Sequence, residues 1–137
     1  GYCPRHEFMS ADEVRQLKEA HPQAQVLVHP ECNAQILALA DYIGSTSGII
    51  KYAAEHTECE EFIIGTVSGV VYKLNESRPD ARFYFPATRP SCPDMEQMTL
   101  DQVIHVLKTG DNAVAMPPEE LTRQAGQALS RMLELAR

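Results

Sequence analysis

The sequence lacks the features that mark several large classes of protein. No apolar run approaches the ~20 residues that a membrane-spanning helix needs, and no segment has the layout of a secretory signal peptide. Internal repeats and low-complexity segments are absent as well. We therefore expect neither a membrane partner nor a repeat architecture.

Basic residues are few and scattered. The chain has 12 Lys and Arg against 19 Asp and Glu, which gives a formal net charge of -7. Binding of nucleic acid needs a stripe of positive charge to meet the phosphates, so we expect no nucleic-acid partner. An acidic, solvated surface is typical of a cytoplasmic protein, and this is the localisation that we predict.

Cysteine is sparse, at four residues in 137: Cys3, Cys32, Cys59 and Cys92. Four cysteines allow three disulfide pairings. Disulfides are rare in the cytoplasm, where the rest of the sequence places this protein. Metal binding is therefore predicted for some of these thiols and burial in the core for the others.

Helical and strand patterns alternate between residues 10 and 86. Apolar segments at 25–28, 42–43, 62–64 and 82–85 predict strands, and the segments 11–20, 33–39, 46–55 and 66–75 between them predict helices. Ser10 with Glu13 has the spacing of a helix-capping box. The alternation predicts an α/β fold, a three-layer αβα domain with a short, four-stranded parallel sheet.

The C-terminal part has a different pattern. Prolines at 86, 90 and 93 exclude regular structure there, and two helices are predicted beyond them, at 100–109 and from about 117 to the C-terminus. Nothing in residues 1–92 needs the apolar side of these helices, so we expect them to cover a part of the protein that this chain lacks. The start at Gly1, without Met, also suggests a piece of a longer protein.

An imidazole and a carboxylate follow the first strand. His29 and Glu31 lie two residues apart, and in extended backbone such residues share a face. The pair could move protons to and from one substrate. The alternative is a surface loop in which Glu31 only stabilises the start of the next helix.

A possible anion site follows the second strand. Gly44-Ser45-Thr46-Ser47 leads into a helix, where free N–H groups and hydroxyls bind carboxylate or phosphate. The alternative is simple helix capping by Ser and Thr. Gly65-Thr66 ends a third strand in the same manner, and Thr66 is predicted to cap the next helix. Because ligands bind at the carboxyl ends of parallel strands, the motifs together favour a small-molecule site.

Two cysteines lie in proline-containing loops that suit metal-bound thiolates. These are Cys3, before Pro4, and Cys92, before Pro93. A second possibility is a structural zinc site made by two cysteines and two histidines: Cys3, His6, His29 and Cys32. Cys59 stands among glutamates, a setting that disfavours a reactive thiolate.

Taken together and in order, these motifs resemble the quinolinate synthase family. The resemblance rests on Gly1-Tyr2-Cys3-Pro4-Arg5-His6, the segment from Val26 to Cys32, Ala40-Asp41, Gly44 to Ser47, Phe62 to Thr66, Cys92 with Met95, and Thr99-Leu100. Two positions depart from the family pattern: Val67 stands where an acidic residue is common, and Glu96 where a lysine is common. We assign no role to either.

The resemblance implies one part of a pseudo-threefold enzyme of three α/β domains. Residues 1–9 would end the preceding domain and carry Cys3, residues 10–92 would be the next α/β domain, and residues 93–137 a C-terminal helical extension. Cys3 and Cys92 would each bind a [4Fe-4S] cluster, whose third cysteine would lie in the missing N-terminal domains. Cys32 would not be a ligand.

The resemblance also implies a reaction. The family condenses iminoaspartate with dihydroxyacetone phosphate to give quinolinate for NAD biosynthesis, and an open iron of the cluster acts as a Lewis acid. Glu31 would be the acid–base residue, with His29 contacting substrate, and Ser45 and Thr46 would hold a carboxylate or phosphate. The isolated fragment would be inactive. The alternative that the residues leave open is a non-catalytic α/β module that binds a small anion, with or without zinc.

Overall fold

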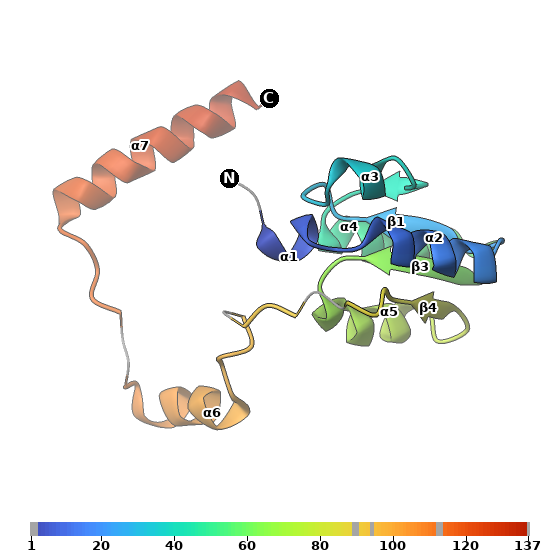
Figure 1. Cartoon of the computed structure of the whole chain (residues 1–137). Coiled ribbons are helices and arrows are strands. Elements are labelled where there is room, and N and C mark those ends of the chain that lie inside the picture. Colours follow the sequence, from blue (N-terminus) through green and yellow to red (C-terminus); the bar gives the residue numbers. More distant parts are fainter. Residues whose placement is uncertain (1–2, 89–90, 94, 112–113, 137) are drawn as a thin grey trace. The chain divides into compact units, whose positions relative to one another are not determined.

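The computed structural model describes residues 3–88, 91–93, 95–111 and 114–136. Its sheet consists of four short parallel strands. The strands are β1 (Gln25–Val28), β2 (Tyr42–Ile43), β3 (Glu61–Gly65) and β4 (Arg82–Tyr84), in the spatial order β2-β1-β3-β4 (Figure 1). Every neighbouring pair is parallel, and Val28 is in register with both Ile43 and Gly65. The parallel sheet expected from the sequence is confirmed.

Helices alternate with these strands. They are α1 (Pro4–Glu7), α2 (Ala11–Ala20), α3 (Ala34–Leu37), α4 (Thr46–Glu55), the 3-10 turn η1 (Ser68–Val70) and α5 (Val71–Ser77). Three of the helices begin at a side-chain cap, because the side chains of Ser10, Asn33 and Ser45 accept the backbone N–H three residues on.

Alternate strand residues face opposite sides of the sheet and build two cores. Val26, Val28 and Ile63 pack with Val14 of α2 and Ile36 of α3. On the other side Leu27, Phe62 and Ile64 pack with Ile49 of α4 and Leu74 of α5. The strands read as continuous apolar runs because helices cover both faces. The domain is therefore a three-layer αβα arrangement.

Two local expectations were wrong. Thr66 does not cap a helix, because the 3-10 turn begins at Ser68 after Val67, which makes no side-chain cap. The capping box at Ser10 is only half formed: the hydroxyl accepts from Glu13 N, but the Glu13 carboxylate accepts from the N–H and hydroxyl of Thr88 instead. In both cases a tertiary hydrogen bond replaces a local one.

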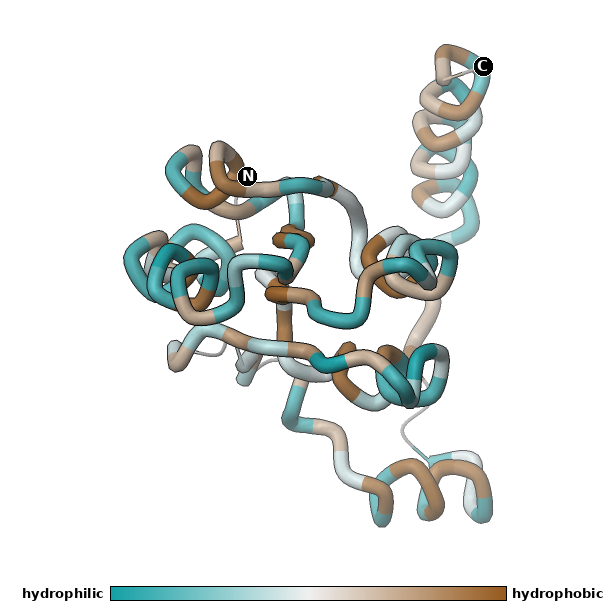
Figure 2. The backbone as a smooth tube through the Cα atoms, turned by 90° about the vertical axis from the view of Figure 1, so that its right-hand side faces the viewer, coloured by the Kyte–Doolittle hydropathy of each residue, from teal (hydrophilic) through white to brown (hydrophobic). Residues whose placement is uncertain are grey.

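The chain divides into two units, Gly1–Gln97 and Met98–Arg137. The second contains α6 (Leu100–Thr109), which ends at Gly110 in the left-handed conformation, and α7 (Glu119–Leu135). Neither helix buries any of its described residues. Apolar positions run along both helices in Figure 2. None of the helices in the described part of the chain is both long and apolar enough to span a bilayer.

Candidate active site

The loops after β1, β2 and β3 run side by side at the carboxyl edge of the sheet. The backbone N–H of His29 donates to Gly65 O at 3.0 Å, and that of Gly44 donates to Val28 O at 3.0 Å. Strand pairing therefore continues one residue beyond β1 and β2. It fixes where His29, Gly44 and Thr66 leave the sheet.

The side chains of His29 and Glu31 lie close together, but in a turn rather than in the extended backbone that we expected, because the N–H of Cys32 donates to His29 O at 3.0 Å. His29 Nδ1 is 3.5 Å from Glu31 Oε2, and it accepts the backbone N–H of Glu31 at 3.3 Å. The His29 side chain is 19% exposed and that of Glu31 is 45% exposed. The carboxylate is therefore held beside an imidazole but remains open to solvent and ligand.

His6 of α1 completes this group of side chains. Its ring stacks on that of His29, with centroids 4.3 Å apart and planes at 14°. His6 Nδ1 is 3.6 Å from Glu31 Oε2 and has no hydrogen-bond partner within the described structure, while Nε2 is 3.0 Å from Thr66 Oγ1. Burial lowers the pKa of His6, the nearby His29 lowers it further, and Glu31 opposes the shift. The ring is therefore neutral near pH 7.

A thiol joins the same group. One ligand atom each from Cys3, His6 and Glu31 lie within 4.8 Å of one another, and no other such group of metal-ligating side chains was found in the described parts of the chain. Asn33 supports this arrangement, since its side-chain N–H groups donate to Glu7 O and Met9 O, both at 3.0 Å. These bonds hold the segment carrying Cys3 and His6 against the loop after β1.

Cys3 and Cys92 occupy the same kind of backbone turn. Each precedes a proline and is half-buried, and its carbonyl accepts the N–H groups three and four residues on. The N···O distances are 3.1 and 3.0 Å at Cys3, and both are 3.0 Å at Cys92. This similarity extends the sequence observation that both cysteines lie in Cys-Pro loops.

The other two cysteines are buried and donate to backbone carbonyls. Cys32 Sγ lies 3.4 Å from Gly65 O, and Cys59 Sγ lies 3.1 Å from Glu61 O. Burial raises the pKa of Cys32 to about 11, and negative charge at Cys3 and Glu31 adds to the shift. Cys32 Sγ is also not part of the group formed by Cys3, His6 and Glu31, which disfavours the two-cysteine, two-histidine zinc set.

Ser45 and Thr46 lie at the start of α4. Ser45 Oγ accepts a hydrogen bond from the N–H of Gly48 at 3.1 Å, so this oxygen caps the helix. The Ser45 O–H can still donate a hydrogen bond to another group. Ser45 is exposed and Thr46 is half-buried. The geometry fits both interpretations of the motif, capping and anion binding, because the two use different atoms of the same residues.

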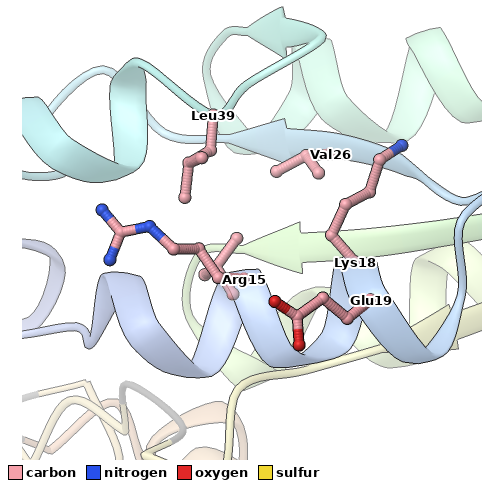
Figure 3. Close-up of a pocket in the computed structure, with 6 residues that line it drawn as sticks. Arg15, Lys18, Glu19, Val26 and Leu39 are labelled. Atoms are coloured by element: carbon pink, nitrogen blue, oxygen red, sulfur yellow. The ribbon is translucent and has the colours of Figure 1, made fainter.

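A separate hollow of about 250 Å³ lies between α2, β1 and the segment after α3 (Figure 3). Its floor is aliphatic, with Val14, Val26 and Leu39, and its rim carries Arg15, Lys18 and Glu19. The hollow shares no residue with the His29–Glu31 group and contains neither thiol nor imidazole. The candidate acid–base and thiol groups described above lie instead at the carboxyl edge of the sheet.

The places of two residues in this site, His6 and Thr66, were not predicted from the sequence. His6 entered only as a zinc ligand, although its place three residues after Cys3 in a helical turn puts both on one face. Thr66 was predicted as a cap, yet it is fully buried and bonded to a side chain 60 residues away. Its position at a strand end was the one available signal.

Comparison with known proteins identifies what this chain resembles. The family model described as quinolinate synthetase A protein matches residues 1–134. Quinolinate synthase of Clostridioides difficile is 40% identical over 136 residues, which cover 99% of this chain and 44% of that protein. Quinolinate synthases of Thermodesulfovibrio yellowstonii (98% and 44% covered) and Methanosarcina barkeri (97% and 43%) are each 38% identical, over 135 and 133 residues.

The chain thus spans about 44% of the length of the curated relatives it matches. The family match covers nearly the whole chain, including the segments that carry Cys3, His6, His29, Glu31 and Cys92. The chain belongs to the quinolinate synthetase A protein family.

Proposed function

We propose that this chain forms part of a quinolinate synthase, which condenses iminoaspartate with dihydroxyacetone phosphate to quinolinate for NAD biosynthesis in the cytoplasm. The observation that carries the proposal is the group of His6, His29 and Glu31 beside Cys3 at the carboxyl edge of a parallel sheet. The names of the relatives support the activity, and their greater length supports a second part of the enzyme beyond this chain.

The residues present fit a [4Fe-4S] cluster. Cys3 and Cys92 each lie in a backbone turn of the same kind, and both are half-buried. A thiolate that binds a cluster at the edge of a domain would have this exposure. One ring nitrogen of buried His6 lies within 4.8 Å of Cys3 Sγ and of a Glu31 oxygen, so polar atoms line this spot. When bound, the cluster would supply a Lewis-acidic iron. The third cysteine would come from the missing N-terminal domains.

Glu31 would transfer protons. Its carboxylate is 45% exposed and has two imidazoles within 3.6 Å, so it can take a proton from a substrate carbon or nitrogen and return one to a leaving oxygen. His29 is the more exposed of the two imidazoles and would contact the substrate directly.

Ser45 and Thr46 would hold the anionic end of a substrate. The helix α4 is ten residues long, and the N–H groups of its first turn carry the positive end of the helix dipole. A carboxylate of iminoaspartate or the phosphate of dihydroxyacetone phosphate would accept hydrogen bonds from the Ser45 hydroxyl and from these N–H groups.

The domain plan follows the same proposal. Residues 1–9 would end one α/β domain, residues 10–92 would form the next, and residues 93–137 would pack on the part outside this chain. The unburied apolar residues of α6 and α7 support the last assignment.

The alternative is a non-catalytic anion-binding module with a single metal ion. One observation favours it: Cys3, His6 and Glu31 offer ligand atoms close enough for a mononuclear site. Such a site would use neither Cys92 nor Cys32.

Anaerobic purification of the complete enzyme that carries this segment separates the two. We expect a brown protein whose cluster absorption is lost in Cys3→Ser and in Cys92→Ser and kept in Cys32→Ser. A colourless protein that holds one zinc ion, and loses it in His6→Ala but not in Cys92→Ser, would favour the module instead.

A further inference from the structure

We propose that Thr66 and His6 form a positioning pair for Glu31. The Thr66 hydroxyl donates to His6 Nε2, and this bond fixes the neutral tautomer of His6 whose Nδ1–H faces the Glu31 carboxylate. The inference rests on the proposed role of Glu31 as the acid–base residue.

Both members of the pair are removed from solvent. Thr66 is 0% exposed and His6 is 5% exposed, and their polar atoms are 3.0 Å apart. The bond joins α1 to the residue after β3, across 60 positions of sequence. Buried polar groups are costly unless paired, so this contact governs the orientation of the His6 ring.

A neutral imidazole has one donor and one acceptor, and the surroundings of His6 decide which nitrogen carries the proton. With the proton on Nε2, the Nδ1 lone pair of His6 would face Glu31 Oε2 at 3.6 Å with no donor to satisfy it, whereas the corresponding lone pair of His29 accepts the backbone N–H of Glu31. With the proton on Nδ1, that N–H faces the carboxylate and Nε2 accepts from Thr66. A hydroxyl can donate or accept, so Thr66 permits the favourable arrangement.

His29 does not replace His6 in this role. Its Nδ1, the atom near Glu31, already accepts the backbone N–H of Glu31, which places the His29 proton on Nε2. Both imidazoles face the same carboxylate oxygen, Oε2. The other oxygen, Oε1, makes no hydrogen bond or ion pair with the described residues. It is therefore the oxygen that remains for the substrate.

The test compares two substitutions at Thr66 in the complete enzyme. Thr66→Val keeps the shape and removes the hydroxyl, whereas Thr66→Ser keeps the hydroxyl and is the matched control. We expect Thr66→Val to lower kcat about 10- to 100-fold, by analogy with metal-bound histidines that lose the partner orienting the ring. KM should change little, and Thr66→Ser should retain most of kcat. Equal kcat losses in both variants would indicate a packing role and overturn the proposal.

A second measurement does not depend on catalysis. Histidine nitrogen chemical shifts of the complete protein, with the His6 signal assigned from its loss in His6→Gln, distinguish the two neutral tautomers. We expect the Nδ1–H form alone in the parent protein and in Thr66→Ser, and a mixture of the two neutral tautomers in Thr66→Val, where the hydroxyl no longer donates to Nε2. An Nε2–H tautomer in the parent would overturn the inference. A parent that shows the expected tautomer but makes no quinolinate would contradict the proposed function alone.

Discussion

Glu31 is the residue on which the proposed chemistry depends most directly. Glu31→Gln keeps the size of the side chain and removes the titrating group. General acid–base catalysis contributes roughly 10²- to 10⁴-fold to a rate. The rate of quinolinate formation by the complete, cluster-loaded enzyme should therefore decrease by a factor within that range.

The matched control for this substitution is Glu55→Gln, at the exposed last residue of α4, whose carboxylate is 3.7 Å from Lys51 Nζ. It should leave turnover unchanged. Near-normal turnover in Glu31→Gln would show that His29, or a residue outside this chain, carries out the proton transfer.

Gly65 lies where the sheet leaves no room for a side chain. A Cβ at this position would be 2.8 Å from Val28 Cγ1 and 3.5 Å from Val28 Cα, at the carboxyl end of the β1–β3 pair. Gly65→Ala should lower the free energy of unfolding by about 1–3 kcal/mol, the usual cost of overpacking a core. Denaturant unfolding of the complete protein measures it.

Gly69 provides the control for Gly65. A Cβ there would meet nothing within 4 Å, and the residue lies in the turn η1. Gly69→Ala should therefore cause no loss of stability. If both substitutions cost the same, the close approach of β1 and β3 at Gly65 is not what makes glycine necessary there.

At the scale of elements, the end of α4 depends on Arg78. The guanidinium is 5% exposed and donates to Ala53 O at 2.8 Å and to His56 O and Cys59 O at 3.0 Å, while it also pairs with Asp80. These carbonyls belong to the last turn of α4 and the loop before β3, where a helix leaves its acceptors unpaired. Arg78 thus joins α4 to the turn that precedes β4.

Arg78→Ala should cost about 3–5 kcal/mol, because it leaves buried carbonyls without donors and empties a packed site. Arg82→Ala is the control: its side chain is 75% exposed and pairs with Glu61 at 3.3 Å, so about 0.2–1 kcal/mol is expected. Thermal unfolding of the two variants measures the difference. Similar melting temperatures would mean that water replaces the guanidinium at these carbonyls.

The elements themselves were largely predictable, and the tertiary hydrogen bonds were not. Strand β1 and helix α4 have the bounds that their apolar spacing and caps indicated, since these signals are local. His6 and Thr66 meet because Asn33 anchors the segment around α1 to the loop after β1, and the β1–β3 register places that loop beside Thr66. No local pattern encodes such a pair, and for the same reason the sequence did not reveal that Glu13 binds Thr88.

For the whole molecule, the C-terminal helices are the part with the most unused apolar surface. In α7 these residues include Leu121, Leu129, Met132 and Leu133, each between 53% and 57% exposed. If α7 packs on the part of the enzyme outside this chain, Leu129→Asp should reduce the stability of the complete protein by about 2 kcal/mol, the value of one buried leucine.

The control lies on another side of the same helix. Gln127→Asp adds the same charge two residues away, which is about 200° around the helix, and should have little effect. Equal unfolding free energies for Leu129→Asp and the parent protein would show that the apolar side of α7 stays in solvent.

The bonds that hold α1 also limit how this molecule can move. His6 to Thr66, and Asn33 to Glu7 and Met9, anchor the N-terminal turn to the loops after β1 and β3. A hinge between residues 3 and 10 would have to break all three. His6 is therefore held in place beside His29 and Glu31, and in the proposed enzyme a movement that admits substrate would have to leave these three side chains together.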